Sequence, residues 1–268
     1  MLSDEVFGSI EHTDNGIQII LPKLIDKDSK FELLCLQTDS VETESLDIDS
    51  SRYFMPVYAD SVIVKRNIIY AVKDGFYSSL PMGDTPTSDY ASYLTAALDN
   101  YRVDGVRPLK LMLDIYSLAN DTKSRRPLII LLHGGAFLFG DKAGSFMQHL
   151  GRYFASRGYV VASVNYRLGC SLLGKPAFER TIYRAVQDAL TAGKFLLDNS
   201  VEYGIEPNAV FFMGHSAGAI TALTASVMKD SERYGSACAN LIREDLGYLE
   251  SSLNLLGTIG FWGGYYRS

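Results

Sequence analysis

Apolar and polar residues follow regular patterns from Ser61 to the end of the chain. Leucine or isoleucine occupies every second position between Leu109 and Ile115, a period that is typical of a β-strand. Two uninterrupted apolar runs follow, Pro127–Leu132 and Tyr159–Val164. Runs of this length without polar residues are typical of strands buried on both faces of a parallel sheet. The pattern therefore predicts a sheet with a buried centre.

Helices are predicted between these strands. Apolar and small residues recur at helical spacing over Thr181–Leu197, and the alanine-rich segment Ala217–Met228 favours a second helix. Further apolar runs predict strands at Val62–Val72, Ala209–Met213 and Leu255–Trp262. Strands that alternate with helices form a mostly parallel sheet with helices on both faces. We therefore expect the α/β fold class.

Residues 1–60 have a different pattern, and we expect them to form an N-terminal extension or flap ahead of a core over residues 61–268. The short apolar runs Ile17–Leu21 and Phe31–Leu36 predict a small hairpin or edge strands. The segment Gln37–Arg52 is rich in acidic and hydroxyl side chains, which is typical of a solvated loop.

Composition limits the classes of protein to which the chain can belong. With 268 residues, 47% of them hydrophobic, it is long enough to bury a sizeable core. A net charge of −6 argues against a nucleic-acid partner, because such proteins normally carry a basic face. No apolar stretch is long enough to predict a membrane span. The first residues lack a signal peptide, so we expect a cytoplasmic protein, or a secreted or periplasmic one whose leader was removed.

No cofactor or metal is predicted. The three cysteines, Cys35, Cys170 and Cys238, are widely spaced and odd in number, which favours neither a disulfide framework nor a zinc site. The glycine-rich turns match no phosphate-binding pattern.

The segment Gly214-His215-Ser216-Ala217-Gly218 matches the pattern G-x-S-x-G. It follows the apolar run Val210–Met213 and precedes the alanine-rich helix. In this context the pattern is typical of a sharp turn that holds a serine in a strained conformation with its hydroxyl exposed. The free N–H groups of the following helix would then point at an oxygen under attack. Ser216 is therefore a candidate nucleophile.

A second motif, His133-Gly134-Gly135-Ala136-Phe137, directly follows the predicted strand that ends at Leu132. Glycines at this position let backbone N–H groups turn towards a site, as an oxyanion hole requires. Both motifs lie at the carboxyl ends of predicted parallel strands, so they should meet in one crevice.

With these two motifs, several others resemble those of the HGG-type carboxylesterases and lipases of the α/β-hydrolase fold. The resemblance covers roughly residues 61–265 and includes Gly140-Asp141-Lys142, Ser163–Leu168, Arg184–Ala189 and Tyr203–Pro207. It implies a small-molecule ester substrate and Ser216 as the nucleophile. It also implies an oxyanion hole formed by the backbone N–H groups of Gly135, Ala136 and Ala217. The supporting motif residues are His133, Gly134, Gly214, His215 and Gly218.

The chain departs from this family in two ways. Ala136 stands where the family usually has a third glycine, although alanine keeps the backbone donor. No histidine follows Ser216, whereas the family orders its residues as serine, acid and histidine. The four histidines are His12, His133, His149 and His215, and the acids after the serine are Asp230, Glu232, Glu244, Asp245 and Glu250.

None of these acids has the position of the family's acid, which leads us to expect an α/β-hydrolase fold that is incomplete at its C-terminus. The last strands, with the acid and the histidine, would then be missing. An unpaired last strand exposes backbone N–H and C=O groups that can pair with another strand, so self-association through Leu255–Trp262 is expected.

Three functions agree with the sequence. The first is a serine carboxylic-ester hydrolase that forms an acyl-enzyme on Ser216, impaired because no acid and histidine follow it. The second is a non-catalytic hydrolase-like binding protein, which the missing base favours. The third is a serine peptidase of the prolyl-oligopeptidase type, although the His133-Gly134-Gly135 turn favours the esterase.

Overall fold

The computed structural model describes most of the predicted core. The described residues are 9–13, 16–20, 53, 61–75, 107–168, 175–228 and 253–261, and all structural statements below concern these.

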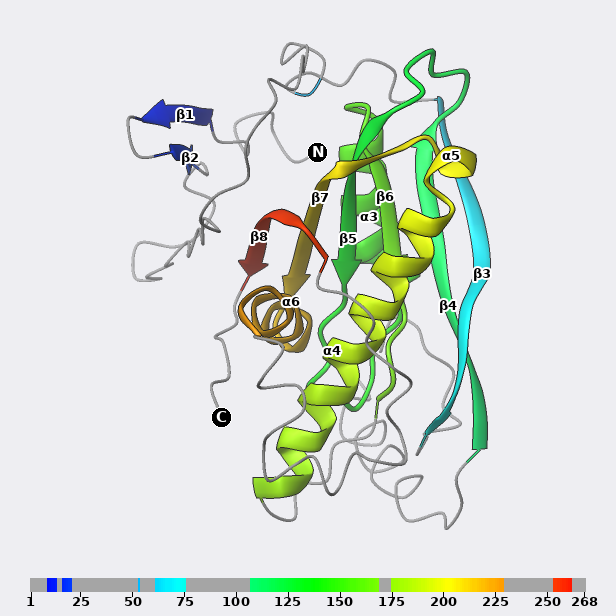
Figure 1. Ribbon diagram of the computed structural model, residues 1–268, viewed down its shortest axis with the longest axis vertical. Coiled ribbons are helices and arrows are strands. Elements are labelled where there is room, and N and C mark those ends of the chain that lie inside the picture. The colour runs from blue at the N-terminus through cyan, green and yellow to red at the C-terminus, as the bar shows by residue number, and fades with distance from the viewer. Residues whose placement is uncertain are drawn as a thin grey trace.

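A six-stranded sheet forms the centre of the molecule, in the order β3-β4-β6-β5-β7-β8 (Figure 1). Strands β6, β5, β7 and β8 run parallel to one another. Strand β4 pairs antiparallel with β6, and β3 pairs antiparallel with β4. Their bounds are β3 Val62–Gly75, β4 Arg107–Leu118, β5 Arg126–Leu132, β6 Val160–Val164, β7 Ile205–His215 and β8 Leu255–Phe261. All six predicted strands are confirmed.

Strand β7 begins four residues earlier than the apolar run that predicted it. The run is preceded by three residues that are not apolar strand formers, Glu206, Pro207 and Asn208. Ile205, before them, still pairs with Arg126 of β5, ahead of a register shift. The apolar pattern therefore located the strand and missed its beginning.

Helices cover both faces of the sheet, as the sequence predicted. Helices α4 (Lys175–Asp198) and α6 (Ala217–Val227) lie on the face turned towards the viewer in Figure 1, and α3 (Ser145–Ala155) lies behind the sheet. The short helix α5 (Ser200–Tyr203) connects α4 to β7.

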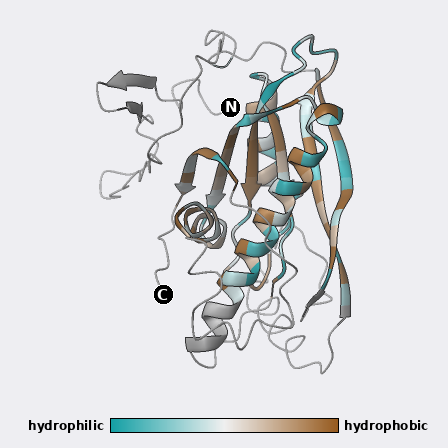
Figure 2. Ribbon diagram, viewed as in Figure 1, coloured by the Kyte–Doolittle hydropathy of each residue, from teal (hydrophilic) through white to brown (hydrophobic). Residues whose placement is uncertain are grey.

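Strand β5 supplies apolar side chains to both layers. Leu128 and Ile130 belong to the core cluster that includes α4 and α6, whereas Ile129 and Leu131 belong to the cluster beneath α3. All seven residues of β5 are buried, and Figure 2 shows the central strands as the most hydrophobic part of the sheet. Burial on both faces explains the uninterrupted apolar run in the sequence.

A separate two-stranded sheet lies near the N-terminus. Strand β1 (Ser9–Thr13) pairs antiparallel with β2 (Gly16–Ile20). The strand predicted at Ile17–Leu21 is thus present, but it pairs with a segment that the apolar pattern did not predict, because Ile10 is the only aliphatic residue in it. The run Phe31–Leu36 and the loop Gln37–Arg52 lie outside the described residues, and the domain division at residue 60 stays a prediction.

Strand β8 is the outermost described strand on its side of the sheet. Self-association through it stays a prediction. None of the described helices is long and apolar enough to cross a membrane.

Candidate active site at the carboxyl ends of β5 and β7

Ser216 occupies a strained position between β7 and α6. Its backbone has φ 52° and ψ −120°, and a positive φ is unfavourable for a side chain with a Cβ atom. Two backbone hydrogen bonds hold this conformation. The N–H of Ser216 donates to Phe261 O of β8 over 2.8 Å, and its C=O accepts from the N–H of Ile220 over 3.0 Å. The half-buried serine is thereby fixed at the first turn of α6.

The two glycines of the motif allow α6 to approach the sheet closely. A Cβ atom on Gly218 would lie 2.1 Å from Leu132 O, at the end of β5. A Cβ atom on Gly214 would lie 2.3 Å from Gly218 O. Both distances are far below van der Waals contact, so the close turn from strand to helix requires glycine at each position.

The second motif forms a tight turn next to Ser216. It begins directly after Leu132, which pairs with Gly214 in the sheet. Three successive residues have positive φ: Gly135 at 124°, Ala136 at 52° and Phe137 at 61°. Alanine and phenylalanine rarely adopt this conformation, so this turn and Ser216 are both strained.

Hydrogen bonds to carbonyl groups set the orientation of two peptide planes in this turn. His133 Nδ1 donates to Gly134 O over 2.8 Å. Because the C=O and N–H of one peptide point in opposite directions, this bond fixes the direction of the Gly135 N–H. In the same way Gly135 O accepts from Leu138 N over 2.9 Å, which fixes the direction of the Ala136 N–H.

These N–H groups are available to a ligand. Neither Gly135 nor Ala136 uses its N–H in a hydrogen bond within the described part of the chain, and Ala136 is exposed. The N–H of Ala217, the first residue of α6, is likewise unused there. The three N–H groups that the sequence singled out are therefore unused in two neighbouring turns, and their role as oxyanion donors stays a prediction.

The ring of His133 is a buried part of the turn. It stacks on Tyr166, with ring centroids 4.5 Å apart, and the Tyr166 hydroxyl donates to His133 O over 2.6 Å. Burial lowers the pKa of His133 to about 4, so the ring is neutral at pH 7. Tyr166 lies in a motif that the resemblance included, but no sequence pattern indicated this contact.

His215 faces the turn rather than Ser216. Its Nε2 accepts a hydrogen bond from the Gly134 N–H over 3.2 Å, and its ring contacts Phe146 of α3 edge-on at 5.0 Å. Burial lowers the pKa of His215 below its ordinary value. His149 lies on the exposed side of α3.

No described side chain forms a hydrogen bond with the hydroxyl of Ser216. The described side chains thus include no base that is hydrogen-bonded to the serine. The side chain of His12 and the five acids that follow the serine in sequence lie outside the described residues.

A buried polar network supports the far end of the turn. Lys142 Nζ lies 2.6 Å from Asp114 Oδ1 and 2.8 Å from Asn67 Oδ1. The Lys142 N–H donates to Asn165 Oδ1, and Asn165 Nδ2 donates to Asp141 Oδ2. This network joins the loop after the turn to β3, β4 and the end of β6.

Within the described residues, no cluster of histidine, cysteine, aspartate and glutamate side chains could hold a metal ion. The site offers instead a strained serine and three uncharged backbone donors, an arrangement suited to stabilising a negatively charged oxygen.

Known proteins match parts of this chain. It is 36% identical over 111 residues to the neuroligin-like protein glit-1 of Caenorhabditis elegans, a match that covers 41% of this chain and 15% of that protein. It is 36% identical over 113 residues to a probable isoprenylcysteine alpha-carbonyl methylesterase, ICME, of Oryza sativa subsp. japonica, covering 42% of this chain and 25% of that protein. These matches thus span a quarter or less of each relative.

Among solved structures, a phosphonate-inhibited esterase B from Lactobacillus rhamnosis aligns over 77% of this chain and 50% of its own, with a TM-score of 0.45 and 20% identity. The sequence profile named BD-FAE matches residues 113–254, which include both the His133–Phe137 turn and the strained serine. The chain belongs to the BD-FAE family of α/β-hydrolases, a carboxylesterase-type family.

Proposed function

We propose that this protein is a serine carboxylic-ester hydrolase with Ser216 as its nucleophile and the N–H groups of Gly135, Ala136 and Ala217 as its oxyanion hole. The observation that carries the proposal is the backbone of Ser216, strained at φ 52° beside a turn with two unused N–H groups. Membership in an esterase family supports the same chemistry.

In the proposed reaction, Ser216 Oγ forms a bond to the carbonyl carbon of an ester and loses its proton to a base. The carbonyl oxygen becomes negatively charged and accepts hydrogen bonds from the three N–H groups. The intermediate then collapses, the bond to the alcohol oxygen breaks, and the alcohol leaves with a proton. Water attacks the acyl-enzyme in the same way and releases the acid.

The reaction needs a base that takes the proton of Ser216, and none of the described side chains is placed to do so. His133 and His215 are engaged in the turn, and the sequence holds no histidine after Ser216. We therefore expect these 268 residues to be phosphonylated by a reactive fluorophosphonate and to turn over esters slowly.

A fluorophosphonate probe tests the proposal. The serine oxygen forms a bond to phosphorus and fluoride leaves, so intact-protein mass spectrometry should show one adduct, located on Ser216 by peptide mapping. Ser216→Ala should abolish labelling. Ser226→Ala is the matched control, because Ser226 lies on the same helix with its hydroxyl bonded to Leu223 O, and it should leave labelling unchanged. Labelling of the Ser216→Ala variant, or none of the wild type, would contradict the proposal.

The alternative is a hydrolase-like binding protein without turnover. The lack of a described hydrogen bond to the Ser216 hydroxyl favours it. Saturable binding of an ester with no release of alcohol, together with no phosphonate adduct, would support this alternative.

A further inference from the structure

His215 links the two turns that build the site. It precedes Ser216 in sequence, yet its ring reaches across to the other turn, where Nε2 accepts the Gly134 N–H over 3.2 Å. A Cβ atom on Gly134 would lie 2.8 Å from the same Nε2, so the ring packs directly against this glycine. Phe146 of α3 contacts the ring edge-on at 5.0 Å and restricts its movement.

This contact requires one protonation state. A nitrogen that accepts a hydrogen bond carries no proton, so the proton of neutral His215 resides on Nδ1. Nδ1 is buried, and no described group bonds to it. Protonation of Nε2 would place two N–H donors against each other at 3.2 Å, and the bond to Gly134 would be lost.

The Gly134 N–H belongs to the peptide whose carbonyl is His133 O, the atom that accepts the Tyr166 hydroxyl. The two bonds hold opposite ends of one peptide plane. The next peptide carries the Gly135 N–H, the first of the proposed oxyanion donors. Movement of Gly134 therefore changes the direction of that donor.

We propose that neutral His215 is a positioning residue that holds the oxyanion turn against the serine turn, and that its protonation releases the turn. The expected effect on the reactivity of Ser216 rests on the proposed function. The structural link between the two turns rests on the hydrogen bond from Gly134 to His215 alone.

The surroundings of the ring support this role. The titratable group that faces His215 from the turn is His133, and the residue packed on it from α3 is the uncharged Phe146. No carboxylate among the described residues is within ion-pair distance of His215. Burial lowers the pKa of His215, so the linking neutral form is the one present at pH 7.

Two substitutions distinguish the role of His215 as a hydrogen-bond acceptor from the effect of its protonation. His215→Gln places an amide oxygen near the position of Nε2 and does not titrate between pH 5 and 8. His215→Leu keeps an apolar side chain and removes the acceptor. His149→Gln is the control, because His149 is exposed on α3. The rate constant for fluorophosphonate labelling is measured for each variant from pH 8 to pH 5, relative to wild type at the same pH.

We expect His215→Leu to label roughly tenfold or more slowly than wild type at pH 8. Removal of an oxyanion donor slows a reaction about a hundredfold or more, and a misplaced donor should cause part of that loss of rate. His215→Gln should label at close to the wild-type rate at pH 8, and its rate relative to wild type should rise as the pH falls. His149→Gln should keep a constant ratio. Slow labelling of His215→Gln at pH 8, or full labelling of His215→Leu, would overturn the inference.

A spectroscopic measurement tests the hydrogen bond without reference to activity. In the ¹⁵N-labelled full chain at pH 7, the Nε2 of His215 should show the chemical shift of an unprotonated, hydrogen-bonded nitrogen, with the proton on Nδ1. The Gly134 amide proton should shift upfield in His215→Leu and stay in place in His215→Gln. A proton on Nε2 in the wild type would refute the link even if Ser216 is labelled, and the predicted shifts would support it even if Ser216 is not.

Discussion

Lys142 Nζ lies 2.6 Å from Asp114 Oδ1, and both side chains are buried where the loop after the His133–Phe137 turn meets the sheet. Asp114 is completely buried on β4, where it also accepts the Asn67 N–H over 2.8 Å. Charged groups are rarely buried unless they are paired. The pair therefore fixes the position of the loop relative to the sheet.

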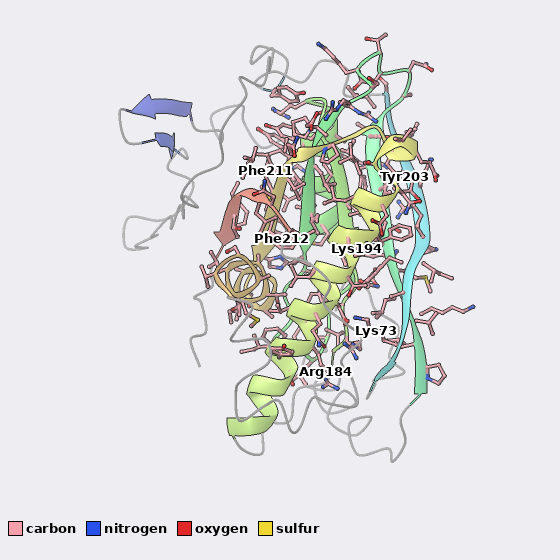
Figure 3. The ribbon with its side chains drawn as sticks, in the orientation of Figure 1. Lys73, Arg184, Lys194, Tyr203, Phe211 and Phe212 are labelled. Atoms are coloured by element: carbon pink, nitrogen blue, oxygen red, sulfur yellow. The ribbon has the colours of Figure 1, made fainter. Side chains whose placement is uncertain are left out.

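Lys142→Met should cost about 3–5 kcal/mol of the free energy of unfolding, because it leaves a buried carboxylate without its nearest cation. Lys194→Met is the control. Lys194 lies on α4 (Figure 3) in an exposed pair with Asp198, and its loss should cost about 0.5 kcal/mol or less. Urea unfolding followed by circular dichroism measures both. Equal losses for the two variants would show that the buried pair does not stabilise the loop.

Gly218→Ala should disrupt the serine turn. Its Cβ atom would meet Leu132 O at 2.1 Å, and the nearest atoms are all backbone atoms of Leu132 and His133, which cannot move aside as a flexible side chain could. We expect a destabilisation of about 1–3 kcal/mol, as for other overpacked sites, and loss of phosphonate labelling. Gly257→Ala on β8 is the control, because its Cβ atom would make an ordinary contact with the Phe211 ring at 3.4 Å. Normal labelling of Gly218→Ala would contradict the close approach of α6 to β5.

Ala136→Gly should leave stability almost unchanged. Alanine at φ 52° is strained by about 1 kcal/mol, and glycine relieves this strain while gaining about 0.4–1 kcal/mol of freedom in the unfolded state. The donor N–H remains, so labelling should persist. Ala222→Gly, in the buried middle of α6, should instead cost about 1 kcal/mol or more. Equal destabilisation of the two variants in thermal unfolding would argue against strain at Ala136.

Stability should fall in acid because of His133. Burial lowers its pKa from 6.5 to about 4, so below pH 6.5 the unfolded chain binds a proton that the folded protein excludes. Burial of neutral His133 therefore lowers the free energy of unfolding only in acid. The free energy of unfolding is unaffected above pH 6.5 and falls by roughly 3 kcal/mol as the pH falls towards 4.

His133→Asn should remove this part of the acid dependence, since asparagine does not titrate and its amide can still donate to Gly134 O. Urea unfolding at several values of pH gives the comparison, with the exposed His149→Asn as control. An unchanged slope in His133→Asn would assign the acid sensitivity to other groups.

The sequence predicted those parts of the molecule that local pattern encodes. Strand β5 was predicted because burial on both faces demands an uninterrupted apolar run, and Ser216 because glycine must stand two residues to either side of it. Contacts between distant segments were missed. Asp114 appeared as one polar position in an alternating strand, although it is completely buried and bonded to Lys142 and to Asn67 of β3. The bond from Gly134 to His215 likewise joins residues that only the folded sheet brings together.

The hydrogen bond from Ser216 N to Phe261 O ties the proposed nucleophile to β8. Phe261 pairs with His215 in the parallel ladder, so the last described strand also holds the turn that contains Ser216. Detaching β8 would free the backbone of Ser216 to relax from its strained conformation while the centre of the sheet, around β5, kept its packing. The strained conformation of the proposed nucleophile is thus held by a strand to which the proposed reaction assigns no chemical group.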